Sequence, residues 1–339
     1  MAALDGLRGA AALWVVLSHC MSLGFLPQVA PFGGVLGVTI FFALSGFLMA
    51  SLHGRQEFNS ETVWTYIVRR GARIAPLYLL VVLIAWLIHA RIDNAFVYNI
   101  NADNITRHLF FSGSEQVFWT IPPEVQFYAF FLLIWVALAR RGKYAVALGV
   151  SIVGMLLVAH RLPGTTLPAK LPFFLFGACA GLVRVRFPER FVSTIQAILL
   201  LSVTAASAIL FHIAGQEEPV YQSFLYAALC ALMILSFSLP ARFGLLLFGN
   251  RVMLALGAWS FSIYLLHEPA LYWGRTIQSA ASLPAWSALL LGLTLTISIS
   301  AAAHYLIERP AQQKLRLLGK SVSHITNFRK LAIAPRDQC

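Results

Sequence analysis

Long apolar segments recur along the whole of this 339-residue chain. A helix needs roughly 20 predominantly apolar residues to cross the hydrocarbon core of a bilayer. Hydrophobic residues make up 59% of the chain and charged residues only 11%, a balance outside the range of soluble globular domains. The sequence therefore predicts an all-α, polytopic transmembrane helix bundle of about ten spans, near residues 7–26, 33–52, 74–91, 121–138, 144–160, 171–186, 191–213, 222–239, 254–274 and 285–307.

The positive charges are distributed unevenly among the connections between these spans. With the N-terminus inside, one side receives all but five of the 25 Lys and Arg residues, the exceptions being Arg91, Arg107, Arg161, Lys170 and Arg275. Cytoplasmic loops collect Lys and Arg, so we expect both termini in the cytoplasm of a bacterial cell, with the bundle in its inner membrane. The formal net charge of +12 then reflects topology and contact with anionic headgroups, and not nucleic-acid binding.

The chain is interpreted as one membrane domain, residues 1–310, followed by a short basic cytoplasmic tail, residues 311–339. Three of the four cysteines fall within predicted spans, and their spacing fits neither a disulfide framework nor a metal site. We therefore expect no metal and no permanently bound cofactor. The first apolar segment lacks a basic region ahead of Asp5 and a small-residue cleavage site, so we interpret it as a retained span.

The first span carries Arg8 at its start and His19 near its middle. Eleven residues return to within about 20° of the same helix face after a rise of about 16 Å. Polar groups inside a membrane are costly and are usually kept for a functional reason. The alternative is a histidine that only hydrogen-bonds to a neighbouring helix, and we favour the functional interpretation.

Three arginines, Arg69, Arg70 and Arg73, lie at the inner end of the third span. Arg69 and Arg73 share a helix face at a spacing of i, i+4, where like charges repel unless an anion lies between them. Guanidinium groups are well suited to bidentate phosphate contacts. The cluster alone is compatible both with a phosphate site and with ordinary positive charge on the inner side.

Two further segments carry polar groups. Glu124, in "FWTIPPEVQFY", falls in the first turn of the fourth span, where it either stabilises the helix dipole or reaches a hydroxylated ligand from the outer mouth, a membrane thickness from the arginines. The segment "SFSIYLLHEP" spaces Ser260, Tyr264 and His267 as a polar stripe on an apolar helix. The long outer connection, residues 92–121, suits a polar, ring-shaped ligand or an interfacial hairpin.

Six motifs then occur in order along nearly the full chain: LDGLRG followed by His19, FFALSGFL at 41–48, RRGARIAPLY at 69–78, WTIPPEVQFY at 119–128, SFSIYLLHEP at 260–269 and IERP at 307–310. Together they resemble the acyltransferase 3 family of integral membrane acyltransferases. The resemblance implies transfer of an acyl group, usually acetyl, from cytoplasmic acyl-CoA to a hydroxyl of a sugar or related acceptor. We expect a cell-envelope polysaccharide as the acceptor.

The resemblance also implies roles for individual residues. The family's motif histidine matches His19, and the arginine of its first helix matches Arg8. Its basic motif matches Arg69, Arg70 and Arg73, and its tryptophan-to-glutamate motif matches Trp119 and Glu124. We therefore expect the four arginines to bind the CoA phosphates, and we expect a catalytic site of His19, Glu124, Tyr264 and His267. The sequence departs from the family's usual residues at Pro122, Pro123 and Phe261. These departures bear on the shape of the acceptor mouth more than on the assignment to this class of enzyme.

Distances along the first helix are consistent with this arrangement. The pantetheine arm of CoA, about 15 to 20 Å long, matches the rise from Arg8 to His19. His19 would act as a general base on the acceptor hydroxyl or form an acyl-histidine, with Tyr264 or Ser260 stabilising the oxyanion. Two rival classes remain open: a proton-coupled transporter or flippase that uses His19, His267 and Glu124 as a relay, and a lipid-interaction scaffold.

Overall fold

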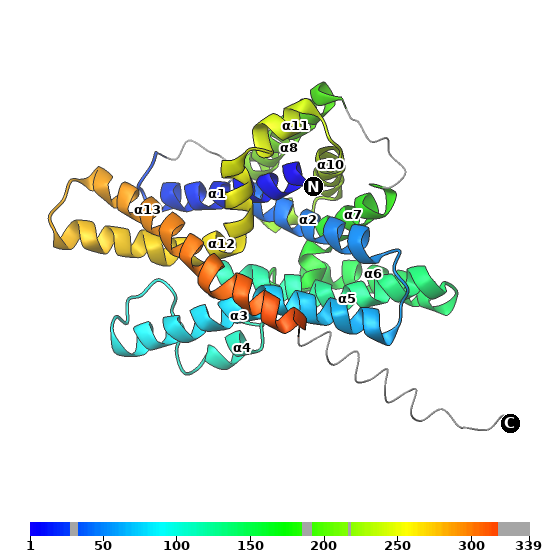
Figure 1. The fold of residues 1–339 in the computed structure, drawn as a ribbon, viewed down its shortest axis with the longest axis horizontal. Coiled ribbons are helices and arrows are strands. Elements are labelled where there is room, and N and C mark those ends of the chain that lie inside the picture. Colours follow the sequence, from blue (N-terminus) through cyan, green and yellow to red (C-terminus); the bar gives the residue numbers. More distant parts are fainter. Residues whose placement is uncertain (28–32, 185–191, 216–217, 318–339) are drawn as a thin grey trace.

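The computed structural model describes residues 1–27, 33–184, 192–215 and 218–317, and it contains helices and no strands within them. The first half comprises α1 (Ala2–Ser22), α2 (Val35–His53), α3 (Ser60–Arg91), α4 (Ile105–Leu109), η1 (Gln116–Thr120), α5 (Ile121–Arg140) and α6 (Lys143–Val158). The second half comprises η2 (Ala159–Arg161), α7 (Leu167–Val183), α8 (Ser193–Ala214), α9 (Glu218–Tyr221), α10 (Phe224–Phe237), α11 (Arg242–Phe248), α12 (Arg251–Ala280), α13 (Ala285–Ala303) and η4 (His304–Glu308). Figure 1 shows α12 and α13 lying side by side as a hairpin that projects from the bundle.

Every predicted span coincides with a helix, but fewer helices are long and apolar enough to cross a membrane. Six of the described helical segments meet that standard, or seven if α10 and α11, which are bent by 95° at their junction, form one broken span. α7 is apolar but short, at 17 residues. α1 and α12, which carry the polar residues of the site, are not among the six. The all-helical class is confirmed for the described residues, with six or seven candidate membrane spans, whereas the count of ten spans and the side of each terminus stay predictions.

The third predicted span begins much earlier than its hydrophobicity indicates. Asn59 caps α3, since its side-chain oxygen accepts from the Thr62 backbone N–H at 2.9 Å and Thr62 Oγ1 accepts from the Asn59 N–H at 3.2 Å. This capping box starts the helix at Ser60, and the helix continues for 32 residues to Arg91. The arginine cluster therefore lies inside a helix and not at its mouth.

Glycines bring α1 and α12 into close contact. A Cβ at Gly9 would lie 2.7 Å from the Gly257 backbone nitrogen, and a Cβ at Gly257 would collide with the Asp5 carbonyl oxygen. Small residues allow this approach of two backbones. The seam is then filled by an apolar stripe from each helix: Ala12, Val16 and Cys20 from α1, and Leu256, Ile263 and Leu271 from α12. The seam fixes where the polar residues of the two helices meet.

The first helix is shorter than its apolar segment predicts. Helix α1 ends at Ser22, and Gly24 follows with a φ of +76°, a conformation that glycine adopts without strain. His19 therefore lies in the last turn of the helix. The prediction that it stands at the middle of the span was wrong, because the apolar residues Phe25 and Leu26 fold back against the seam between α1 and α12 instead of extending the helix.

The end of α13 also differs from the predicted boundary at Pro310. The helix passes through a π turn at His304–Glu308 and continues to Leu317. Proline has no N–H and its ring clashes with the carbonyl four residues earlier, and a π turn immediately before it relieves that conflict. The first residues of the predicted tail are thus helical, and residues 318–339 lie outside the described part of the chain.

Candidate active site

All four arginines that the sequence singled out line one cavity of about 690 Å³. The cavity is bounded by α1, α2, α3, α12, the π turn and the helix that follows it, and its arginines are Arg8, Arg69, Arg70, Arg73 and Arg316. Asp5, Glu308 and His304 also line it. Guanidinium groups from three separate helices therefore line one space, and because five arginines face only two carboxylates, the cavity has an excess of positive charge that favours an anionic ligand.

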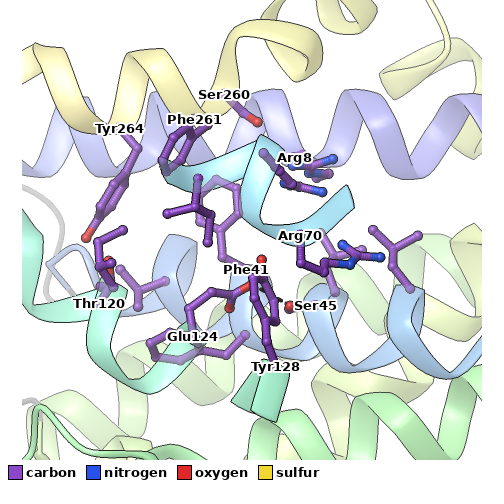
Figure 2. A pocket seen from close by; sticks show the side chains of 17 residues that line it. Arg8, Phe41, Ser45, Arg70, Thr120, Glu124, Tyr128, Ser260, Phe261 and Tyr264 are labelled. Atoms are coloured by element: carbon purple, nitrogen blue, oxygen red, sulfur yellow. Dashed lines mark hydrogen bonds between the residues drawn. The ribbon is translucent and has the colours of Figure 1, made fainter. Parts of the chain in front are cut away.

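A second, narrower cavity of about 90 Å³ adjoins the first. The two share Arg8, Arg70, Arg73, Ser260 and Phe261. In Figure 2, Arg8 and Arg70 face each other from opposite walls, while Tyr264 and Thr120 lie at the far end. Apolar side chains line much of the space between, including Val38, Phe41, Leu44 and Ile74. We call this narrow cavity the neck.

Glu124 lies in the neck and not at an outer mouth. The Ser45 hydroxyl donates to Glu124 Oε1 at 2.6 Å, and Tyr128 and Ser45 lie close to it in Figure 2. The prediction that a membrane thickness separates Glu124 from the arginines was wrong. Because α3 begins at Ser60, Arg70 and Arg73 lie level with the first turns of α5, and Glu124 shares their cavity.

Arg70 is the most buried of the cluster, with 9% exposure. Its guanidinium lies 5.7 Å from the ring centre of Tyr128 and 6.0 Å from that of Tyr66, contacts of the cation–π type. The Tyr66 hydroxyl donates to the Tyr128 carbonyl at 2.9 Å, which joins α3 to α5 at this level. Arg70 Nε has no hydrogen-bond partner among the described residues, so the buried cation retains a donor for a ligand.

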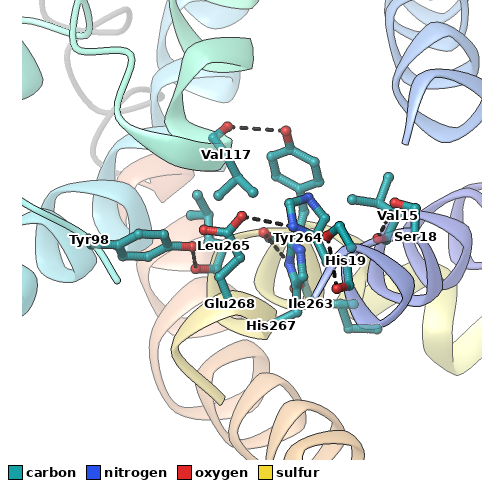
Figure 3. A network of polar contacts seen from close by, with 11 residues as sticks. Val15, Ser18, His19, Tyr98, Val117, Ile263, Tyr264, Leu265, His267 and Glu268 are labelled. Atoms are coloured by element: carbon teal, nitrogen blue, oxygen red, sulfur yellow. Dashed lines mark hydrogen bonds and ion pairs between the residues drawn. The ribbon is translucent and has the colours of Figure 1, made fainter. Parts of the chain in front are cut away.

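His19 meets two residues of α12 beyond the neck (Figure 3). His19 Nδ1 lies 3.0 Å from Glu268 Oε1, and the His19 ring centre lies 4.9 Å from that of His267. Glu268 and His267 are buried, at 3% and 0% exposure, whereas the His19 side chain is 30% exposed. The structure thus brings together two predicted catalytic histidines and a carboxylate that was not predicted.

Glu268 is the residue that sequence reasoning missed. It stands in the quoted segment SFSIYLLHEP, directly after His267. An acidic residue within an apolar helix is itself a sign of function, and that sign was present. Its partner, however, is at the other end of the chain, so only the packing of α1 on α12 identifies the pair.

Tyr264 separates the neck from the histidines. It lines the neck, its ring centre lies 6.1 Å from that of His267, and its hydroxyl donates to the Val117 carbonyl at 3.1 Å. Ser260, one turn earlier, lines both cavities. The residues of the predicted polar stripe therefore follow a path from the arginines to His267.

The connection between α3 and α5 packs over the same part of α12. The Tyr98 hydroxyl donates to the Leu265 carbonyl at 2.8 Å, the group that Pro269 leaves without its helical N–H partner. Burial raises the pKa of Tyr98 well above its ordinary value and lowers the pKa of His108 to about 4. Tyr98 and His108 are both fully buried, so this connection packs against the bundle over α12.

These features define a helical membrane protein with an arginine-lined cavity, a neck that ends at Tyr264, and a histidine–glutamate pair beyond Tyr264 whose carboxylate is buried. Residues 1–305 match the sequence family described as an acyltransferase domain, acyltransferase 3. The chain belongs to the acyltransferase 3 family. The predicted resemblance is thereby confirmed over nearly the whole chain.

Similar proteins with curated names come from Staphylococcus aureus. The chain is 23% identical over 374 residues to "Putative O-acetyltransferase SAS0844" of strain MSSA476, covering 98% of this chain and 61% of that protein. It is 22% identical over 356 residues to "O-acetyltransferase OatA" of strain NCTC 8325 / PS 47, covering 92% of this chain and 57% of that protein. The chain thus spans less than two thirds of the length of these relatives. No solved structure matches it significantly.

Proposed function

We propose that the chain is a membrane-embedded O-acyltransferase that moves an acetyl group from acyl-CoA to a hydroxyl of a carbohydrate of the cell envelope. The family and the names of the relatives support acyl transfer to oxygen. The observation that carries the proposal is the arginine-lined cavity that shares a wall with the neck. Tyr264 at the far end of the neck is close to His267, and His267 in turn contacts His19.

The donor would be bound by its charges. The phosphates of CoA take the place between Arg8, Arg69, Arg70 and Arg73, where an anion relieves the repulsion of the guanidinium groups. The pantetheine arm enters the apolar neck, and the thioester comes to rest near Tyr264. Because both Arg8 and His19 belong to α1, the eleven-residue separation of about 16 Å matches the length of that arm.

The His19–Glu268 contact assigns an acid–base role to each ring nitrogen. Nδ1 faces the carboxylate at 3.0 Å, so it carries the proton, and Nε2 is left with a lone pair that can accept one. A carboxylate that orients an imidazole in this way also stabilises the imidazolium that forms. Glu268 is therefore a positioning residue for His19, the general base.

The transfer step then balances. His19 Nε2 accepts the proton of the acceptor hydroxyl as its oxygen attacks the thioester carbonyl carbon. The new C–O bond forms, and the oxyanion is stabilised by the Ser260 hydroxyl or by that of Tyr264 once it turns away from the Val117 carbonyl. The C–S bond then breaks. The CoA thiolate leaves and recovers the proton from the imidazolium as a thiol.

The proposal is tested with the purified chain, acetyl-CoA and envelope glycans as acceptors. Free CoA thiol should appear only when acceptor is present, and mass spectrometry should find acetyl additions on the glycan. His19→Ala should abolish both signals, while Arg140→Ala, at the exposed end of α5, should not. Proton or solute movement in liposomes without any thiol release would instead favour the transporter, in which the same histidines relay protons.

A further inference from the structure

The three side chains His19, His267 and Glu268 form a cluster whose geometry has a second use. Each offers one ligand atom, and these atoms all lie within 4.8 Å of one another. Two imidazoles and one carboxylate are a ligand set that zinc uses with three protein ligands and one open position. The sequence predicted no metal, because only the cysteine spacing was considered and His19 is far from α12 along the chain.

His267 is held in the state that ligates metals. Its Nδ1 lies 2.8 Å from the Tyr264 carbonyl oxygen and 3.1 Å from that of Ile263. Carbonyl oxygens only accept hydrogen bonds, so Nδ1 carries the proton and Nε2 bears the lone pair. Metal-bound histidines typically donate their other N–H to a carboxylate or backbone carbonyl in this way. His267 Nε2 is fully buried and has no partner among the described residues.

Glu268 supplies a second unpartnered atom. Its Oε1 faces His19 Nδ1, but its Oε2 is buried and has no hydrogen-bond partner within the described chain. A buried carboxylate oxygen without a donor is costly. His19 is the partly exposed member of the cluster, whereas the two orphaned atoms belong to buried residues.

We propose that His19, His267 and Glu268 form a binding site for a divalent transition metal, with zinc as the preferred ion. The ligands are His267 Nε2, a Glu268 carboxylate oxygen and His19 Nδ1. Zinc is favoured over magnesium and calcium because imidazole nitrogens make up two of the three ligands. A fourth position stays open to water.

Metal at this site inhibits acyl transfer, a consequence that rests on the proposed function. Coordination through Nδ1 moves the proton of the neutral His19 ring to Nε2. The ring then has no lone pair for the acceptor hydroxyl, and Glu268 is no longer available to orient it. Zinc and general-base catalysis therefore exclude each other at His19.

Metal binding is measured first, without any activity. The detergent-purified full chain, free of a polyhistidine tag and stripped with chelator, is titrated with Co²⁺ while the visible absorption is recorded, and then with Zn²⁺ in competition. We expect one saturable site with His and carboxylate ligation, and displacement of Co²⁺ by Zn²⁺. His267→Ala and Glu268→Gln should each weaken binding by about tenfold or more, because each removes one of three ligands. His212→Ala, which removes an exposed imidazole from α8, should bind like the wild type.

Folding and activity are controlled separately. Each variant must elute as the wild type does in size exclusion and must still bind CoA; if His267→Ala fails this check, Glu268→Gln decides alone. The absence of a saturable site, or equal Co²⁺ affinity in a folded ligand variant and the wild type, overturns the metal site. If the metal binds as expected but chelator abolishes transfer instead of increasing it, the inhibitory role is overturned. If no transfer occurs under any condition, the proposed function fails while the metal site stands.

Discussion

At the scale of single residues, the carboxylate of Glu268 is far more deeply buried than the His19 imidazole that it contacts. Glu268 is 3% exposed against 30% for His19, and one of its oxygens already lacks a partner. A buried carboxylate without a partner is costly, so the His19 imidazole stabilises Glu268 while Glu268 orients His19. The pair is therefore expected to act as a unit, with non-additive effects when both members are changed.

Glu268→Gln tests the positioning role. The amide can no longer stabilise the imidazolium and can hold His19 in the wrong tautomer, so we expect turnover to fall by about 100-fold or more. The CoA dissociation constant should change little, because Glu268 lines neither cavity. Steady-state kinetics and calorimetry on the same preparation measure the two effects. Wild-type turnover in Glu268→Gln would contradict the assignment.

Glu124→Gln should act on the donor as well as on turnover. Its carboxylate shares the neck with Arg70 and Arg73, where a negative charge opposes an anionic ligand. Removing that charge should tighten CoA binding several-fold, while loss of acceptor orientation lowers turnover. Asp103→Asn, in the exposed part of the connection, is the matched control and should change neither. Weaker CoA binding in Glu124→Gln would show that the charge argument is wrong.

Residue types and spacing predicted the separate polar groups but not all of their neighbours. The four arginines share a cavity, as residues that bind one donor must, and His19 contacts His267, as residues of one catalytic site must. Glu124 was misplaced because its position depends on where α3 starts, and Glu268 was missed because its partner is on α1. Both facts are set by contacts between distant segments, which spacing along the chain does not report.

At the scale of elements, the seam between α1 and α12 holds the site together. Gly257→Ala should separate the helices, because the added Cβ collides with the Asp5 carbonyl. We expect a loss of about 1 to 3 kcal/mol of stability, typical of overpacking, together with reduced transfer. Thermal unfolding in detergent measures the first effect. Gly149→Ala on α6 is the control, since a Cβ there meets nothing within 4 Å.

The melting temperatures of Gly257→Ala and Gly149→Ala are compared with each other. Alanine at Gly149 should be neutral or slightly stabilising, because alanine is a better helix former than glycine. If Gly257→Ala melts at the same temperature as Gly149→Ala, the close approach of α1 and α12 is not what stabilises the seam.

The connection between α3 and α5 should make stability depend on pH through His108. Burial lowers its pKa to about 4 from an ordinary 6.5, so between these values the unfolded chain binds a proton that the folded chain does not. The contribution of His108 is therefore present above pH 6.5 and is lost as pH falls toward 4. Melting temperatures should fall less steeply with acidification in His108→Gln than in the wild type. His160→Gln, which changes an exposed histidine, is the control and should show the same dependence of melting temperature on pH as the wild type. An equal dependence in all three proteins would refute the role of His108.

Hydrophobicity alone placed the start of the third span at residue 74, whereas the polar cap at Asn59 starts α3 at Ser60. The π turn before Pro310 was not predictable, because it resolves a conflict between a proline and a helix that tertiary packing maintains. Local chemistry therefore predicted which elements exist better than where they end.

At the scale of the whole molecule, topology is the open prediction. The charge distribution places both termini inside and the connection 92–121 outside. Reporters inserted after Asp103 and after Lys320 should report opposite compartments. Reports from the same compartment would rule out the ten-span arrangement. The class of fold followed from composition, whereas the number of spans does not follow from helix length, because α1, α7 and α12 are too polar or too short to be counted by hydrophobicity alone.

The proposed division between donor binding at the arginine cavity and chemistry at His19 is tested most directly by measuring both in two variants. Arg69→Ala combined with Arg73→Ala should raise the CoA dissociation constant by about 10- to 100-fold, since charged hydrogen bonds contribute about 1.5 to 3 kcal/mol each and Arg69 is exposed, and the difference from wild type should shrink at high salt. His19→Ala should bind CoA as the wild type does and give no acylated product. A His19→Ala protein that acylates its acceptor at a near wild-type rate would contradict the catalytic role and leave the histidine a packing residue.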